Sequence, residues 1–179
     1  MWGWGRREVR SAPSQPSTHG THNASAALLL VCSARREADL VTKYEIPEMV
    51  KRGKGAIVNN GSVTGLIGAP GAVANVSSKH GVTGLTKSAA LQYATQGIRV
   101  NAVAPGNVRT PTFARFIAAH PAAEAAVLST VPQGRWCESE EVADAVIFLC
   151  SAASHITGHV LPVDWGLDSA LSLLECADL

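Results

Sequence analysis

The sequence predicts an α/β fold built on a parallel sheet. Two observations lead to this prediction: short apolar, β-branched segments alternate with longer helix-like segments, and one of the latter has a clear helical period. Such alternation is typical of strand–helix–strand units whose strands run parallel. The chain has 179 residues, 46% of them hydrophobic, so it has the length of about one domain and enough apolar side chains for a core.

Charge and cysteine content exclude several classes of protein. The formal net charge is +1, which argues against binding nucleic acid or an anionic membrane surface. The apolar run at residues 24–34 is far shorter than the roughly 20 residues that cross a bilayer. The cysteines lack metal-ligand spacing, so we expect reduced thiols in a soluble, cytoplasmic protein without a metal site. The four cysteines are Cys32, Cys137, Cys150 and Cys176.

Residues 1–39 differ in character from residues 40–179. The first segment contains Pro13 and Pro16 among serines and shows no sustained period, so we expect an irregular extension. An alternative is a targeting segment, because arginines at positions 6, 7 and 10 precede an apolar stretch. Residues 40–179 form the second predicted unit.

Regular elements begin at Leu40. The segment Leu40 to Val50 predicts the end of a helix that Pro47 interrupts, and Gly53 and Gly55 close it. A short buried strand is predicted for residues 56–60. Residues 61–71 contain four glycines and a proline, and this composition predicts a loop.

The clearest element is a long helix predicted from Asn75 to Thr95. Apolar and small side chains recur there at helical spacing and predict one buried stripe. The stripe consists of Val82, Leu85, Thr86, Ala89, Ala90 and Tyr93. A strand is predicted next, from Gly97 to Ala104, because apolar and polar residues alternate there before Pro105 and Gly106.

Four further elements complete the sequence pattern. Helices are predicted around residues 113–119 and 122–130, and another starts at Ser139, whose hydroxyl can cap free amides. Glu140 and Glu141 favour that start because they lie at the positive end of the helix dipole. The last strand, residues 159–164, contains Pro162, which cannot donate to a ladder and therefore predicts a sheet edge.

Four motifs in register resemble the C-terminal part of a short-chain dehydrogenase/reductase, from about Leu40 to Leu167. They read Gly-Ala-Ile-Val-Asn at 55–59, Ser-Lys-His-Gly-Val at 78–82, Ile-Arg-Val-Asn-Ala-Val at 98–103 with Pro-Gly at 105–106, and Thr-Gly-His at 157–159. The resemblance implies a partial Rossmann-like, doubly wound parallel sheet that contains only the later strands and helices of the family fold.

The resemblance also implies catalytic positions. Ser62 resembles the serine that hydrogen-bonds the reacting oxygen, and Lys79 resembles the lysine that holds the cofactor ribose and lowers the pKa of a tyrosine. The tyrosine belongs four residues before this lysine, where the spacing brings an ammonium beside a phenol on one helix face. This sequence has Asn75 there, and an amide does not titrate in the range that proton transfer needs.

The cofactor expected from the resemblance is NAD or NADP. Four residues resemble the segment at the nicotinamide end: Pro105, Gly106, Val108 and Thr110. The glycine-rich turn that binds pyrophosphate in this family has no counterpart in the sequence. We therefore expect an oxidoreductase of alcohols or ketones that is inactive or impaired.

Two alternatives belong to other classes. The chain could be a non-catalytic, family-like subunit that forms a homo-oligomer through its helices. A hydrolytic dyad of Ser62 with Lys79 is the second alternative, although no sequence feature supplies an oxyanion hole for it.

Overall fold

A computed structural model describes residues 43–151 and 155–174. The predicted extension 1–39 and two of the cysteines, Cys32 and Cys176, lie outside the described residues. The described elements, in chain order, are α2 (Ile46–Arg52), β1 (Gly55–Asn60), η1 (Val63–Gly65), α3 (Val73–Tyr93), η2 (Ala94–Gln96), β2 (Ile98–Pro105), α4 (Pro111–Ala119), α5 (Pro121–Ser129), α6 (Ser139–Ser151), β3 (Val160–Val163) and α7 (Leu167–Leu174).

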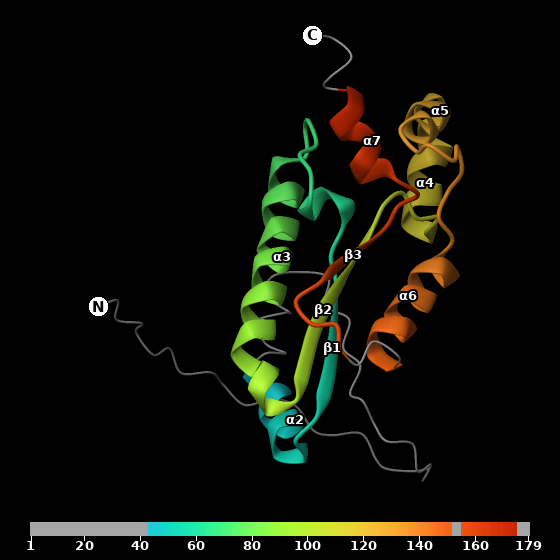
Figure 1. Cartoon of the computed structure of the whole chain (residues 1–179). Coiled ribbons are helices and arrows are strands. Elements are labelled where there is room, and N and C mark those ends of the chain that lie inside the picture. Colours follow the sequence, from blue (N-terminus) through green and yellow to red (C-terminus); the bar gives the residue numbers. More distant parts are fainter. Residues whose placement is uncertain (1–42, 152–154, 175–179) are drawn as a thin grey trace, which may run out of the picture.

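The three strands form one parallel sheet in the order β1-β2-β3 (Figure 1). Gly55 pairs with Ile98 at one end of the sheet, and Pro105 pairs with Val163 at the other. Among the described strands, β3 lies at one edge, as its Pro162 predicted, because an edge strand tolerates a residue without an N–H. The predicted parallel α/β fold is confirmed.

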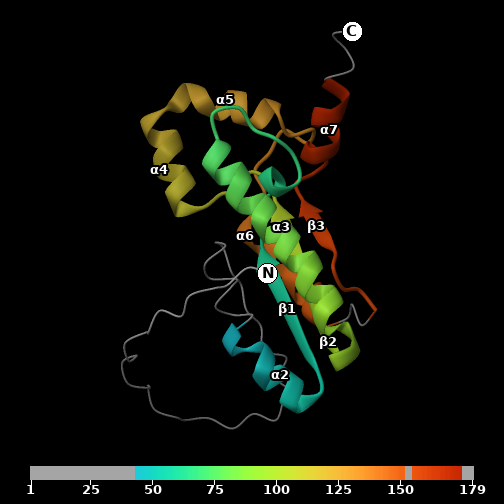
Figure 2. The same ribbon diagram turned by 90° about the vertical axis from the view of Figure 1, so that its left-hand side faces the viewer.

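Helices cover both faces of the sheet, as a doubly wound fold requires. Figures 1 and 2 show α3 along one face and α6 along the opposite face. On the α3 side, the buried core consists of Ile46, Met49, Ile57, Ala89, Ala90, Ile98 and Val100. On the α6 side, it consists of Val58, Val103, Val146 and Leu149. The alternation of β1 and β2 side chains between these two clusters follows from the strand period of two.

The predicted element positions agree with the structure to within a few residues. The long helix begins at Val73, two residues earlier than expected, and its last predicted residues form the short η2 turn. Within the expected stripe, Val82 and Thr86 are buried and Leu85 is half-buried. The expected loop at 61–71 contains a short 3-10 turn, η1.

The helix break predicted from Pro47 is present, but it lies before the proline. Lys43 and Tyr44 are helical, Glu45 is a turn, and α2 restarts at Ile46 with Pro47 in its first turn. A proline fits there because the first helical amides have no partner within the helix. Gly53 then ends α2 with a left-handed φ of 67°, a conformation that glycine adopts without strain.

Neither membrane-spanning helices nor metal-ligand groups occur in the described part of the chain. None of the helices described is long and apolar enough to cross a bilayer. No group of three or more His, Cys, Asp or Glu side chains is placed there to hold a metal ion.

Candidate functional site

The residues that the sequence singled out lie around the carboxyl end of the sheet. Ser62 follows β1 at the start of η1, Asn75 and Lys79 lie in the first turns of α3, and Pro105 ends β2. In open parallel sheets, ligands bind outside the carboxyl ends of the strands. The fold therefore gathers these residues at the end of the sheet where a ligand is expected.

The Ser62 hydroxyl accepts two hydrogen bonds from one neighbour. The Thr64 amide donates to Ser62 Oγ at 3.2 Å, and the Thr64 hydroxyl donates to the same oxygen at 3.0 Å. A serine hydroxyl has two acceptor positions and one proton to donate. Both acceptor positions are used by Thr64, so the remaining hydrogen-bonding capacity of the Ser62 hydroxyl is its own proton.

Asn75 joins this cluster through Thr64. Its amide nitrogen Nδ2 donates to Thr64 Oγ1 at 3.1 Å, so a chain of hydrogen bonds runs from Asn75 through Thr64 to Ser62. Thr64 belongs to this hydrogen-bond cluster, and the sequence reasoning did not single it out. The available signal was its place two residues after Ser62, since serine side chains in turns bond the backbone two residues on.

Lys79 lies one helical turn beyond Asn75 and is half-buried. Its Nζ donates to the backbone carbonyl of Asn60 at 3.2 Å, which ties α3 to the end of β1. Gly65 lets η1 pack closely against α3, because a Cβ at that position would lie 2.8 Å from the Lys79 carbonyl oxygen. The hydrogen bonds thus link Ser62 and Asn75 through Thr64, and they link Lys79 to the end of β1.

The segment after β2 turns away from the sheet toward α4. The Gly106 amide donates to the Val163 carbonyl at 3.1 Å, and a Cβ on Gly106 would lie 2.9 Å from Asp164 Cβ. Val108 pairs with Cys137 in an isolated parallel bridge. Thr110 caps α4, its hydroxyl accepting from the Phe113 amide at 3.2 Å, as threonine does at helix starts.

The described residues offer only some of the groups that a dinucleotide cofactor would need. Lys79 and the segment from Pro105 to Thr110 offer an ammonium and hydroxyl near the sheet end, which suits a ribose and a nicotinamide. The turns after β1 and β2 lead into η1, of three residues, and into the Thr110-capped α4. Neither turn has the G-x-G-x-x-G spacing that lets a backbone approach a pyrophosphate at a helix start.

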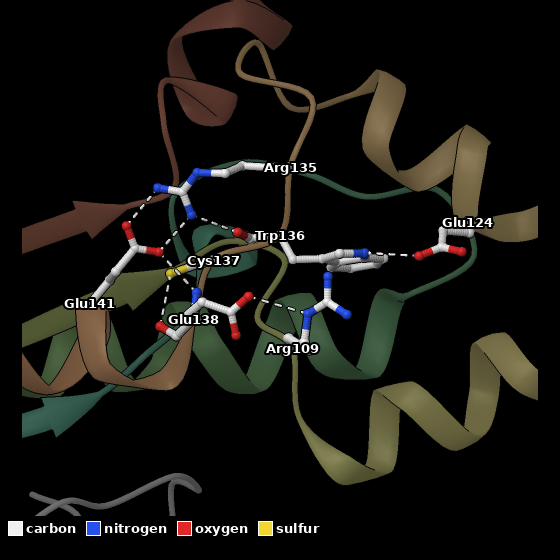
Figure 3. Close-up of polar contacts among 7 residues, drawn as sticks. All are labelled: Arg109, Glu124, Arg135, Trp136, Cys137, Glu138 and Glu141. Atoms are coloured by element: carbon white, nitrogen blue, oxygen red, sulfur yellow. Dashed lines mark hydrogen bonds and ion pairs between the residues drawn. The ribbon is translucent and has the colours of Figure 1, made fainter.

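A second feature of this end is a pocket of about 240 Å³ between α4, α5 and the loop before α6. Seven residues line it: Arg109, Phe113, Ala114, Ile117, Ala118, Glu124 and Trp136. Trp136 is buried, its ring centroid lies 4.9 Å from that of Phe113, and its indole nitrogen donates to Glu124 at 3.1 Å. Figure 3 shows the indole of Trp136 pointing toward Glu124.

The loop before α6 is held to that helix by an arginine–carboxylate pair. Arg135 donates two hydrogen bonds to Glu141, at 2.7 and 2.8 Å (Figure 3). The hydrogen bonds from Arg135 lower the pKa of Glu141 from 4.5 to about 2, because they favour the ionised carboxylate. Glu141 also accepts from the Glu138 amide at 2.9 Å, so one side chain orders the start of α6.

Comparison with known proteins places this geometry in a family. The family model described as enoyl-(acyl carrier protein) reductase matches residues 21–168. Cyclohexanol dehydrogenase of Acinetobacter sp. (strain SE19) is 48% identical over 122 residues, which are 68% of this chain and 46% of that protein. The 2,5-dichloro-2,5-cyclohexadiene-1,4-diol dehydrogenase of Sphingobium indicum is 46% identical over 129 residues, 71% of this chain and 52% of that protein.

A solved structure gives the same result for the fold. The structure of ElxO with NADP bound superposes with a TM-score of 0.71 and 40% identity, covering 74% of this chain and 54% of that one. The chain therefore spans about half the length of the relatives it matches. It belongs to the short-chain dehydrogenase/reductase family of oxidoreductases, with a Rossmann-type α/β fold.

Proposed function

We propose that this chain carries the carbonyl-binding and ribose-binding part of an NAD(P)-dependent oxidoreductase acting on alcohols or ketones, and that it is inactive or strongly impaired as it stands. The observation that carries the proposal is the hydrogen-bond chain from Asn75 through Thr64 to Ser62, at 3.1 and 3.0 Å. It leaves the Ser62 proton free for a ligand oxygen and puts an amide where the family has its titrating phenol.

Ser62 supplies binding and polarisation. A hydroxyl whose acceptor positions are filled by Thr64 is a better donor to a third group, because hydrogen bonds in a chain polarise one another. A ketone oxygen only accepts hydrogen bonds, so it matches this donor. Ser62 thus orients a carbonyl at the end of β1.

Asn75 does not supply the proton that reduction of a ketone requires. General acid–base catalysis typically contributes about 10² to 10⁴ in rate, and an uncharged amide contributes none of it. Lys79, whose ammonium donates a hydrogen bond to the Asn60 carbonyl, would hold a cofactor ribose. The bound NAD(P) would supply the hydride, and the residues that would bind its pyrophosphate are not among those described.

The names of two relatives suggest which substrates to test. Cyclohexanol dehydrogenase and the dichlorocyclohexadienediol dehydrogenase are both named for alcohols on a six-membered ring. We take ring alcohols and ketones as the substrates to test first.

Cofactor titration is the decisive experiment. We expect NADH and NADPH, followed by their fluorescence, to bind weakly, with turnover of cyclohexanol or cyclohexanone at background level. Asn75→Tyr alone should not restore turnover, and Asn75→Phe is its matched control. Micromolar binding of either cofactor, or turnover by the unmodified chain, would overturn the impairment.

One observation favours a second candidate, a non-catalytic subunit that associates through α3. Leu91 is 83% exposed and Val73 is 76% exposed, while Val82, Thr86, Ala89 and Ala90 of the same helix are buried against its own sheet. A large exposed apolar side chain on a long helix suits pairing with a second copy across a two-fold axis.

Substitution on the outer face of α3 tests this candidate. Ser88→Arg or Leu91→Arg should shift a dimer to monomer in light scattering while circular dichroism stays unchanged. Ala125→Arg, on the exposed surface of α5, is the control and should leave the mass unchanged. If neither Ser88→Arg nor Leu91→Arg changes the mass, the subunit role is excluded.

A further inference from the structure

The turn that joins β3 to α7 has an unusual backbone conformation. The Leu167 amide donates to the Asp164 carbonyl at 3.3 Å, so residues 164–167 form a four-residue turn. Its two central residues, Trp165 and Gly166, have φ values of 53° and 80°. Positive φ at both central positions characterises a type I′ turn, in which glycine, asparagine and aspartate dominate. Within the described residues, Trp165 is the only one other than glycine with a positive φ.

The same four residues have a less strained alternative. A left-handed φ brings the Cβ of Trp165 too close to the following carbonyl oxygen. A type II turn needs positive φ only at its second central position, where glycine is preferred. Gly166 occupies that position, so Trp165 would adopt a negative φ in this alternative. The sequence therefore allows two turn states, and the structure has the one that is strained at Trp165.

A contact outside the turn holds the strained state. Trp165 is 52% exposed, so burial in the core does not fix it. The guanidinium carbon of Arg135 lies 5.3 Å from the centroid of the Trp165 ring, a distance at which a cation is attracted to the face of an aromatic ring. Arg135 itself is fixed by its two hydrogen bonds to Glu141 at the start of α6 (Figure 3). Trp165 is thus tied to α6 through Arg135.

The turn also touches the start of α7 and the segment after β2. The buried Asp164 carboxylate accepts from the Gly166 and Asp168 amides at 3.0 and 2.9 Å, which caps the first turn of α7. A Cβ on Gly106 would lie 2.9 Å from Asp164 Cβ, so the turn lies directly against this glycine. A change of turn state therefore reaches both α7 and the Gly106 segment.

We propose that Trp165 and Arg135 form a latch that selects between the two turn states. With the ring against Arg135, the turn keeps its left-handed state and Asp164 stays against Gly106. When this contact is lost, Trp165 relaxes to a negative φ and the turn loosens, while the sheet stays folded. The inference goes beyond the proposed function, because the latch needs neither cofactor nor substrate. Weak NAD(P) binding or absent turnover does not affect the outcome of its test.

Two substitutions at Trp165 separate the strain from the contact in nuclear magnetic resonance spectra of the full chain. Trp165→Asn and Trp165→Ala both remove the ring, but asparagine tolerates a left-handed φ and alanine does not. We expect strong cross-relaxation between the amide and Hα protons of residue 165 in the unmodified chain and in Trp165→Asn, and weak cross-relaxation in Trp165→Ala. The Gly166 and Asp168 amides should exchange roughly 5-fold or more faster in Trp165→Ala than in Trp165→Asn.

Arg135→Met breaks the contact while the ring stays in place. The cross-relaxation at Trp165 should weaken, and the Gly166 and Asp168 amides should exchange roughly 5-fold or more faster. The same substitution in the Trp165→Asn variant should leave these two amides unchanged, because neither strain nor contact remains there. Arg109→Met, which removes the arginine that pairs with Glu138, is the matched control and should leave the turn unchanged.

Three outcomes would overturn the latch. The first is unchanged cross-relaxation and exchange in Arg135→Met. The second is equal behaviour of Trp165→Ala and Trp165→Asn. The third is equal acceleration by Arg135→Met with and without the ring, which would mean that Arg135 acts on the turn only through Glu141. Circular dichroism checks that each variant is folded, and Arg135→Gln replaces Arg135→Met if the latter is not.

Discussion

The sheet with its flanking helices and the α4–α5 lobe are held together in different ways. In the sheet region, Val58, Val103 and Leu149 have no exposed surface. In the lobe, neither α4 nor α5 contains a fully buried residue, and Trp136 with its contacts to Phe113 and Glu124 anchors the two helices. The difference indicates a firmly packed scaffold that carries a weakly anchored lobe, since segments with few buried contacts open at lower free energy.

The largest expected contrast comes from removing core volume. Leu149→Ala should lower the free energy of unfolding by about 2–5 kcal/mol, because Leu149 is fully buried and the variant leaves a cavity. Ile117→Ala in α4 is the matched change in the lobe and should cost about 1 kcal/mol or less, because Ile117 is only half-buried. Urea denaturation measures both, and equal losses would contradict the contrast.

Substituting one arginine in each region, Arg99 and Arg109, tests the same difference in stability. Arg99 of β2 donates to the carbonyls of Leu149 and Cys150, at 2.7 and 3.0 Å, near the end of α6. Arg99→Met should therefore cost about 2 kcal/mol, as expected for hydrogen bonds from a charged group at the negative end of a helix.

The lobe's counterpart is Arg109, whose side chain is 59% exposed in its pair with Glu138. Arg109→Met should cost about 0.5 kcal/mol or less, because exposed ion pairs contribute little. Chemical denaturation of both variants decides the point. A larger loss from Arg109→Met than from Arg99→Met would show that the lobe is the more strongly held region.

Trp136→Phe should loosen the lobe and leave the sheet intact. Phenylalanine keeps a ring beside Phe113 but loses the hydrogen bond to Glu124, which should cost about 1 kcal/mol. Hydrogen exchange should become faster at amides of α4 and α5 and stay unchanged at amides of β1 and β2. Faster exchange in the sheet would mean that the two regions unfold as one unit.

The two regions also differ in how far the sequence predicts them. The strands, the long helix and the edge position of Pro162 follow from local periodicity and from the missing N–H of proline. The helix period places Asn75 and Lys79 one turn apart on α3, whereas only the family resemblance singled out Ser62. Local sequence patterns therefore predict most of the strands and helices of the scaffold.

Contacts between elements could not be predicted in this way. The bond from Trp136 to Glu124 spans 12 positions, and it depends on how α5 folds back against the loop before α6. The bond from Asn75 to Thr64 spans 11 positions and depends on the course of the loop between β1 and α3. Neither distance is encoded in a local pattern, so Thr64 and the pocket emerge only from the three-dimensional structure.

The smallest expected effect on stability is electrostatic. It involves Glu141 at the start of α6, where the lobe joins the scaffold. Glu141 has a pKa of about 2 in the folded chain, lowered from 4.5 chiefly by hydrogen bonds from Arg135. Because the folded-state pKa is the lower one, Glu141 stabilises the fold above about pH 4.5, and this contribution is lost as the pH falls toward about 2. Glu141→Gln should therefore be less stable than the unmodified chain at neutral pH.

The stability difference between Glu141→Gln and the unmodified chain should shrink steadily across that acidic window, as followed by urea denaturation at successive pH values. Glu140→Gln removes the exposed neighbouring carboxylate and serves as the control, with a difference that stays small throughout. Because Glu141 also accepts from the Glu138 amide, the amides at the start of α6 should exchange faster in Glu141→Gln, and the sheet amides should not. A pH-independent difference would mean that the Arg135–Glu141 pair contributes through packing and not through charge.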